Sequence, residues 1–310
     1  MNERSVIVDC DTGVDDALAL LLALRASSLN VIGITTLAGN VRLERVLRNT
    51  LIVVEHSGKR VPVYRGQAQP LFAPLETAEY AHGHNGLADQ PFAEPTTSLA
   101  AGHAVDYLIE TFMSSSGDVE LVTTGPLTNI GLALMREPRL GQRIPRLTMM
   151  AGGITHGNAT AAAEFNVYVD PEAADVVFRS AIPKVMIALE PIANGATLAE
   201  TEVEQLETSP SPWCQMASRL LRWYLSKRPS PVSPCDPAAM AVALDPSIAV
   251  SEPCHVVIET EGKHTRGMTL VDRRPRLLGG QIRAPANVDV VLEIDTAGYR
   301  ELFIKTLLTG

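Results

Sequence analysis

The sequence predicts an α/β protein with an open, mostly parallel sheet, flanking helices and extra strands near the C-terminus. Short runs of β-branched and apolar residues alternate with segments of helical periodicity, which is typical of parallel strands joined by crossover helices. The first run, residues 5–8, shows no polar alternation, so we expect it to be buried on both faces. After Cys254, strand-like runs predominate.

The predicted elements follow one another in a regular order. Hydrophobic periodicity predicts strands at residues 5–8, 30–37, 61–64, 118–123, 146–150, 184–189, 255–260, 265–271 and 288–294. It predicts helices at residues 15–26, 41–56, 98–114, 128–136, 171–179, 213–226 and 297–308. The first helix has Asp15 and Asp16 in its first turn, where the helix dipole favours negative charge. Apolar spacings of three and four mark the helix at 41–56, and Pro138 ends the helix at 128–136.

Two segments interrupt this order. Residues 82–101 are polar and weakly periodic, and residues 209–237 contain six prolines around a single helical stretch. Long irregular segments within a compact domain often form binding loops or lids. No internal repeat or low-complexity linker divides the chain, so we expect one domain over residues 1–310.

Composition and charge argue against several function classes. The 26 Lys and Arg residues against 35 Asp and Glu give a net charge of −9, which does not suit a nucleic-acid surface. The four cysteines lie far apart, so neither a disulfide framework nor a zinc site is expected, and free thiols fit a reducing compartment. The longest apolar stretch, residues 17–24, is too short to span a bilayer. With no signal peptide apparent, we expect a cytoplasmic protein that binds neither membrane nor nucleic acid.

Polar residues gather where the predicted strands end. In open parallel sheets, ligands bind beyond the carboxyl ends of the strands. The polar residues that follow these ends include Asp9, Asp11, Asp15, Asp16, Asn40, Thr124, Asn158, Glu164 and Asn166. All of them offer oxygen atoms, and none of the turns has the glycine-rich form that cradles a phosphate. Oxygen ligands suit a hard cation, calcium or magnesium, better than zinc.

Four carboxylates lie within the eight residues from Asp9 to Asp16. Such groups repel one another unless a cation or a proton intervenes. Three interpretations stay open at this point: a metal site, caps of the following helix, or a phosphatase of the haloacid-dehalogenase type with an aspartate nucleophile and magnesium. The last needs a later lysine and a second acidic pair at strand ends. The strand that begins at Lys184 ends in Glu190-Pro191, and no acidic pair follows.

The order of motifs resembles that of the nucleoside hydrolase family. Residues 9–17 are similar to the family's N-terminal fingerprint, and residues 123–130 are similar to its central motif. The ribose-binding stretch of the family resembles residues 157–160, 163–166 and 170–174. An apolar helix after Cys235-Asp236-Pro237 and the later Gly267-Met268-Thr269 complete the order. The resemblance covers nearly the whole chain, and it implies the nucleoside hydrolase fold with a Rossmann-like core.

The resemblance also implies roles for individual residues. It implies a calcium site formed by Asp11, Asp16, the backbone carbonyl of Thr124 and Asp236. Asp11 is implied as the general base that takes a proton from a calcium-bound water, and Asp9 as support behind the metal. The residues implied to bind substrate are Asp15, Asn40, Met150, Asn158, Glu164, Phe165 and Asn166. For Met150 and Phe165, ordinary core packing is the competing interpretation.

The group that helps the base to depart is the open part of this prediction. A nitrogen leaving group departs more easily when protonated, and histidine suits this because its pKa lies near neutrality. In family members that act on inosine and uridine, a histidine precedes the last calcium-binding aspartate. This chain has Cys235 there and resembles a branch with cysteine at that position. His82 matches the histidine-bearing loop near the family's base pocket, so we predict His82 and Cys235 as catalytic residues beside Asp11. Further candidates for the base side are His84, His156, Trp223 and Tyr224.

The implied function is calcium-dependent hydrolysis of the N-glycosidic bond of ribonucleosides to ribose and free base. Because this bond breaks through an oxocarbenium-like sugar, nearby carboxylates and a metal-oriented water suit the reaction. Two alternatives stay open. One is hydrolysis of a modified nucleoside or nicotinamide riboside, which Cys235 motivates. The other is a calcium-dependent ribose- or nucleoside-binding protein without turnover. The family resemblance also implies a homodimer or a homotetramer.

Overall fold

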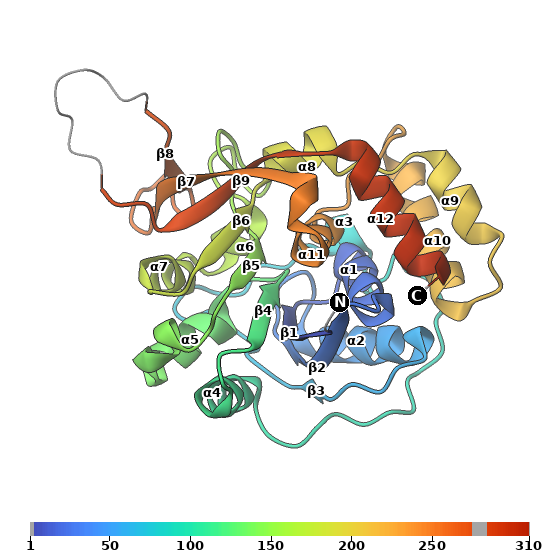
Figure 1. Ribbon diagram of the computed structural model, residues 1–310, viewed down its shortest axis with the longest axis horizontal. Coiled ribbons are helices and arrows are strands. Elements are labelled where there is room, and N and C mark those ends of the chain that lie inside the picture. The colour runs from blue at the N-terminus through green and yellow to red at the C-terminus, as the bar shows by residue number, and fades with distance from the viewer. Residues whose placement is uncertain (1–2, 275–283, 310) are drawn as a thin grey trace.

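A nine-stranded sheet runs through the molecule (Figure 1). The computed structural model describes residues 3–274 and 284–309. The strands lie in the order β3-β2-β1-β4-β5-β6-β9-β7-β8. Their bounds are β1 Arg4–Cys10, β2 Leu29–Thr36, β3 Val63–Tyr64, β4 Val119–Thr123, β5 Leu147–Met150, β6 Lys184–Ile187, β7 Ala249–Ile258, β8 Thr269–Asp272 and β9 Val288–Ile294.

Most of the sheet is parallel. Every pairing from β3 to β9 in the sheet order is parallel, whereas β7 runs antiparallel to β9, and β8 antiparallel to β7. The predicted α/β sheet with extra C-terminal strands is therefore confirmed. From β1 the chain passes through β2 to β3 and then returns to β4 on the other side of β1. This reversal leaves a crevice at the carboxyl ends of β1 and β4, where open α/β sheets bind ligands.

Helices cover both faces of the sheet. Their bounds are α1 Val14–Arg25, α2 Leu43–Ser57, α3 Glu79–His82, α4 Ala104–Ser114, α5 Thr128–Arg136, α6 Phe165–Val169, α7 Pro171–Arg179, α8 Leu189–Gly195, α9 Glu200–Glu207, α10 Pro212–Lys227, α11 Asp236–Leu244 and α12 Thr296–Thr309. In Figure 1, α4, α5 and α7 lie on the left of β1, and α1, α2 and α12 on its right. Within the described ranges, no helix combines the length and apolar character needed to cross a membrane.

Strand β1 is buried on both faces, as predicted. Ile7 belongs to the apolar core with α4 and α5, whereas Val6 and Val8 belong to the core with α1 and α11. Helix α1 is itself buried along nearly its whole length, because α2 and α11 pack against it. The first turn of α1, with Asp15 and Asp16, is therefore enclosed within the protein.

One predicted helix begins later than its sequence pattern suggests. The helix predicted at residues 98–114 starts at Ala104. Before it, Arg65 and His103 form a parallel bridge, which holds the chain extended. His103 Nδ1 then accepts a hydrogen bond from the backbone N–H of Val105 at 3.2 Å and caps the helix.

Other boundaries differ because local turns interrupt the pattern. The strand predicted at residues 184–189 ends at Ile187, and α8 begins two residues later. The strand predicted at residues 265–271 is shortened to β8, since Gly267 has a left-handed φ of 83° that ends the extended backbone. Helices α3, α6, α8 and α9 were not predicted, because their four, five, seven and eight residues are too few for a clear helical period.

Candidate active site

A pocket opens at the carboxyl ends of the parallel strands. The segments that follow β1, β2, β4 and β5 meet there with α3 and the start of α11. The predicted site residues that line it are Asp15, Asn40, His82, Thr124, Met150, Asn158, Glu164, Phe165, Asn166, Cys235 and Asp236. The remaining two, Asp11 and Asp16, are fully buried behind this lining. The fold therefore brings together residues that are spread from Asp11 to Asp236 along the chain.

An acidic cluster forms the inner wall of the pocket. Carboxylate oxygens of Asp15, Asp16 and Asp236 lie within 4.8 Å of one another, close enough to share one metal ion. The Asp11 carboxyl adds to this cluster: burial raises its pKa most, and the charges of Asp16 and Asp15 raise it further.

Asp16 is held by three donors. Its Oδ2 accepts hydrogen bonds from the backbone N–H of Gly13 and from Asn40 Nδ2, both at 2.9 Å. Its Oδ1 accepts from the Thr124 hydroxyl at 2.7 Å. Asn40 also donates its backbone N–H to Asp11 Oδ2 at 2.6 Å. One asparagine thus fixes two of the carboxylates.

Two carboxylate oxygens in the cluster have no hydrogen-bond partner although they are buried. These atoms are Asp11 Oδ1 and Asp15 Oδ1. A buried polar atom without a partner costs roughly 1–3 kcal/mol, more when it is charged. Asp15 lines the pocket, and Asp11 is buried behind it, so a cation or a polar ligand bound at the cluster is the natural partner for these atoms.

The ionisation of the cluster depends on what it binds. Burial raises the pKa of Asp11, Asp16 and Asp236, and the charges of neighbouring carboxylates raise it further. Without a compensating positive charge, these groups therefore hold protons more tightly than ordinary carboxyls do. The side-chain atoms that could bind a metal ion here are all oxygens, and a hard cation such as Ca²⁺ or Mg²⁺ prefers oxygen ligands. The residues present fit a resident metal ion.

Asp9 lies behind the cluster rather than in the pocket. Its Oδ1 accepts hydrogen bonds from the Thr35 hydroxyl at 2.5 Å and from Asn129 Nδ2 at 2.8 Å. Burial raises the pKa of Asp9 to about 7, although these two hydrogen bonds oppose the shift. The support from Thr35 and Asn129 was not predicted, since a single buried threonine or asparagine carries no distinctive sequence signal.

Glu164 and Asn166 form the part of the pocket at the start of α6. Glu164 Oε1 accepts from the backbone N–H of Asn166 at 2.9 Å, and its Oε2 accepts from that of Gly152 at 2.8 Å. Burial raises the pKa of Glu164 to about 6. Asn166 Nδ2 donates to the carbonyl oxygens of Thr124 at 2.8 Å and Met150 at 3.1 Å. The Thr124 carbonyl still has a second lone pair for another partner.

His82 and Cys235 lie in the pocket lining beside Asp15. The backbone N–H of Val14 donates to His82 Nδ1 at 3.1 Å, and Asp15 Oδ1 lies 3.5 Å from the same nitrogen. A neutral imidazole that accepts the Val14 hydrogen bond carries its proton on Nε2. The backbone N–H of Cys235 donates to Asp15 Oδ2 at 3.3 Å. Burial raises the pKa of the Cys235 thiol, and the charges of Asp15 and Glu164 add to the rise, so the thiol is neutral at physiological pH.

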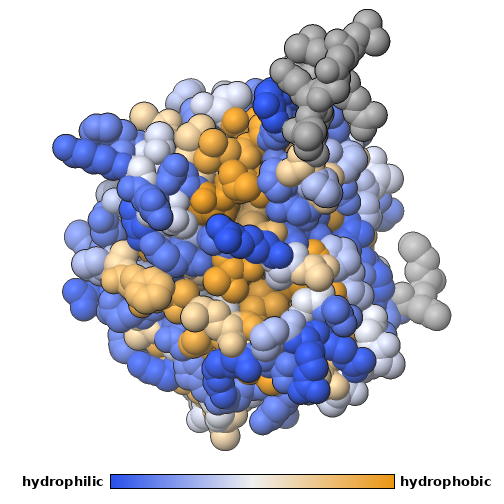
Figure 2. Space-filling model, turned by 90° about the vertical axis from the view of Figure 1, so that its left-hand side faces the viewer, coloured by the Kyte–Doolittle hydropathy of each residue, from blue (hydrophilic) through white to orange (hydrophobic). Residues whose placement is uncertain are grey.

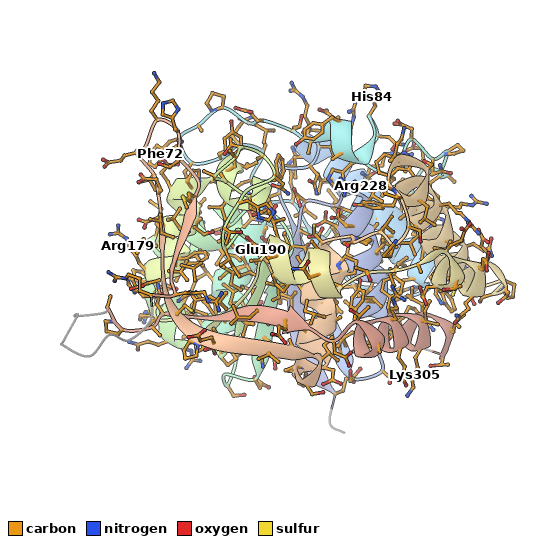
Figure 3. The ribbon with its side chains drawn as sticks, turned by 90° about the horizontal axis from the view of Figure 1, so that it is seen from above. Phe72, His84, Arg179, Glu190, Arg228 and Lys305 are labelled. Atoms are coloured by element: carbon orange, nitrogen blue, oxygen red, sulfur yellow. The ribbon has the colours of Figure 1, made fainter. Side chains whose placement is uncertain are left out.

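The other candidates for the base side do not line the pocket. Figure 3 shows His84 at the edge of the molecule. His156 is exposed and lies 3.2 Å from Glu190. Tyr224 is buried in the apolar core, and Trp223 packs partly against that core. Three lining residues were missed by the sequence analysis: Ala78, Ala81 and the exposed Tyr80, all at or on the short helix α3.

The fold and the pocket define a class of enzyme with a mostly parallel α/β sheet and a buried, metal-suited carboxylate cluster. The model of the inosine-uridine preferring nucleoside hydrolase family matches residues 6–301. The chain therefore belongs to the nucleoside hydrolase family. Membership makes it an N-ribosyl hydrolase.

Individual relatives agree with this assignment. The chain is 37% identical, over 98% of each sequence, to the pyrimidine-specific ribonucleoside hydrolase RihA of Photobacterium profundum. Among solved structures, a plant nucleoside hydrolase, the PpNRh1 enzyme, superposes with a TM-score of 0.92 at 27% identity over 99% of both chains. The purine-preferring ribonucleoside hydrolase of Gardnerella vaginalis gives a TM-score of 0.88 at 30% identity over 98% of both chains.

Proposed function

We propose that this enzyme hydrolyses the N-glycosidic bond of ribonucleosides in a calcium-dependent reaction, with Asp11 as the general base. The observation that carries the proposal is Asp11 Oδ1, a fully buried carboxylate oxygen without a partner beside the acidic cluster. Relatives with this family's fold act on pyrimidine or purine ribonucleosides by name. We therefore leave the base open and propose the ribose as the common feature of the substrate.

The proposed metal ligands are oxygens of four residues, which come from three segments of the chain. They are the carboxylates of Asp11, Asp16 and Asp236 and the backbone carbonyl of Thr124. A bound Ca²⁺ would orient the attacking water and make it more acidic. It would also neutralise the mutual repulsion that raises the pKa of the three carboxyls.

Asp11 is suited to accept the proton of the attacking water. Its Oδ2 is fixed by the backbone N–H of Asn40, which leaves Oδ1 available. A general base must lie in a defined position and have a proton affinity matched to its task. Burial and the neighbouring charge of Asp16 supply that affinity, because both raise the pKa of Asp11.

The ribose would lie between the acidic cluster and the start of α6. Asp15 Oδ1 has no hydrogen-bond partner, although His82 Nδ1 lies 3.5 Å away, and it could accept a hydrogen bond from a sugar hydroxyl. Asn40, Asn158, Glu164 and Asn166 are the further proposed ribose contacts. Several carboxylates around the sugar would stabilise the positive charge that develops as the bond to the base breaks. Met150 and Phe165 give the lining an apolar part for the sugar and the base.

The base would leave toward His82 and Cys235. His82 Nε2–H is a donor that the Val14 contact leaves unused, and the Cys235 thiol is a weaker donor. We therefore propose His82 as the main hydrogen-bond donor to the departing base and Cys235 as an auxiliary one.

We further propose that residues 1–310 form a single domain, which the continuous sheet supports.

We also propose that the protein is a cytoplasmic homodimer or homotetramer. Figure 2 shows an apolar band across the face on the left of Figure 1. On the β7–β8 hairpin at that side, the paired residues Val257 and Leu270 are 43% and 42% exposed. Contiguous exposed apolar surface is typical of a face that another chain covers.

A substrate panel tests the proposed activity. The purified protein is given uridine, cytidine, inosine, adenosine, guanosine and nicotinamide riboside, with Ca²⁺ and again after chelation, and released ribose is measured as reducing sugar. We expect ribose from at least one nucleoside, a loss of roughly a hundredfold or more on chelation, and recovery when Ca²⁺ is restored. No ribose from any of the six would contradict the proposal, and full activity after chelation would contradict its calcium dependence.

A further inference from the structure

A carboxylate outside the pocket holds the loop that carries part of the proposed ribose site. This loop, residues 151–163, joins β5 to α6. Glu190 Oε1 accepts from the backbone N–H of Ile154 at 3.0 Å, and from the backbone N–H and hydroxyl of Thr155 at 2.6 and 2.8 Å. Its Oε2 accepts from the same Ile154 N–H at 2.9 Å. His156 Nδ1 lies 3.2 Å from Oε1.

Glu190 is positioned for this contact by α8, which begins just after β6. Its side chain is only 18% exposed, and Figure 3 shows it on α8 near the centre of that view. Burial alone would raise its pKa, but the donors of Ile154 and Thr155 together lower the pKa below its usual value. The carboxylate is therefore ionised at neutral pH, and hydrogen bonds to a charged acceptor are the stronger kind.

A second contact fixes the same loop from β8. The Thr269 hydroxyl accepts a hydrogen bond from the backbone N–H of Gly153 at 3.0 Å and donates one to the Gly153 carbonyl. The turn that follows is tight, since a Cβ on Gly153 would lie 1.9 Å from the carbonyl oxygen of His156. Two elements outside the pocket thus hold residues 153–155.

Residues 153–155 lead directly into the pocket lining. Only His156 and Gly157 separate Thr155 from Asn158. Asn158 Oδ1 accepts from the backbone N–H of Phe165 at 2.8 Å, which leaves the side-chain NH₂ free to donate. Asn158 is exposed at the rim, so its place depends on the backbone that carries it.

We propose that Glu190 is a positioning residue, which fixes the 151–163 loop so that the Asn158 amide faces the ribose. Glu190 itself does not line the pocket. The inference rests on the proposed hydrolysis of ribonucleosides and adds a residue to the machinery that recognises the sugar. It predicts that the loss of Glu190 acts on substrate binding through Asn158 and through no other group.

A double-mutant cycle tests this dependence. Glu190→Ala is expected to raise KM about tenfold with little change in kcat. Within an Asn158→Ala background the same change is expected to raise KM less than twofold, because coupled residues are non-additive. Glu202→Ala is the matched control, since Glu202 Oε2 also accepts a backbone N–H, that of Ala199 at 2.7 Å, but in the first turn of α9. If the two substitutions raise KM by factors that simply multiply in the double mutant, the proposal is overturned. An unchanged KM in Glu190→Ala would overturn it as well.

Hydrogen–deuterium exchange gives a readout that does not need turnover. We expect Glu190→Ala to increase exchange in residues 157–165, which make no direct contact with Glu190, and Glu202→Ala to leave that segment unchanged. Unchanged exchange there in Glu190→Ala would overturn the inference. If Glu190→Ala does not fold, Thr155→Val removes only the hydroxyl contact and enters the same cycle. Absence of turnover by the wild type would contradict the proposed function, whereas the exchange result judges the role of Glu190 alone.

Discussion

The Asp9 carboxylate is enclosed by protein, and only one of its oxygens has hydrogen-bond partners. Oδ1 accepts from Thr35 and Asn129, while Oδ2 is buried without a partner. The charged form is therefore unfavourable, and the pKa is raised from 3.8 to about 7, chiefly by burial. Asp9 supports the acidic cluster from behind at a cost to stability near neutral pH.

This environment predicts a pH-dependent stability that Asp9→Asn removes. In the unfolded chain Asp9 loses its proton near pH 3.8, whereas in the folded protein it keeps the proton up to about pH 7. The folded state binds more protons in this window, so its stability falls as the pH rises from about 4 to 7. Denaturant unfolding in chelator should show the wild type losing up to roughly 4 kcal/mol relative to Asp9→Asn over that range. Parallel pH curves for the two proteins would contradict a raised pKa.

At the scale of elements, the turn between β1 and α1 controls the geometry of the pocket. A Cβ on Gly13 would lie 2.5 Å from His82 Nδ1 and 2.9 Å from Asn40 Nδ2. Real Cβ atoms do not approach other atoms so closely, so Gly13→Ala must displace one or both side chains. This is why the residue between the acidic pairs is a glycine, although its own φ of −94° is open to any residue.

Gly13→Ala is therefore expected to reduce activity far more than stability. Displacement of pocket residues by about 1 Å can lower catalysis by roughly a hundredfold. The control is Gly141→Ala, whose Cβ would meet its nearest neighbour, the Ala181 nitrogen, at 3.4 Å. Measured kcat/KM should fall steeply in the first variant and stay near the wild-type value in the second. Equal activity in both would show that the β1–α1 turn tolerates a side chain.

The elements also show how far the sequence could predict the structure. Hydrophobic runs located β1 and α1 because burial selects apolar residues along the whole length of a central element. The four-residue helix α3 carries Tyr80 and His82 to the pocket, but so short a segment has no period to detect. The hydrogen bond from Thr155 to Glu190 could not be predicted either, because it depends on the spatial order of β5 and β6 rather than on spacing along the chain.

At the scale of the whole molecule, the metal is expected to stabilise the fold. Helix α11 brings Asp236 to Asp15 and Asp16 of α1, and α1 packs against α11. Burial of several like charges between two core helices is unfavourable without a cation. The metal-free protein should therefore be least stable at a pH at which these carboxyls are ionised.

Calcium should therefore raise the melting temperature more at pH 8 than at pH 5. At pH 5 protons compete for carboxyls whose pKa is raised, so the metal binds more weakly. A ligand at a hundred times its Kd adds about 2.7 kcal/mol to the free energy of unfolding. Asp236→Asn, which removes one proposed ligand, should lose most of this gain in thermal unfolding at pH 8. An equal calcium effect in wild type and variant would place the ion elsewhere.

The central claim is that Asp11 activates the water that cleaves the bond to the base. It is tested most directly by the rate of ribose release from the best nucleoside of the panel, compared between wild type and Asp11→Asn in saturating Ca²⁺. Asparagine keeps the size of the side chain and the acceptor for Asn40 but cannot take a proton. Loss of a general base lowers kcat by roughly a hundredfold to ten-thousandfold, and we expect a fall in that range with KM little changed. An Asp11→Asn enzyme with the wild-type kcat would contradict the account.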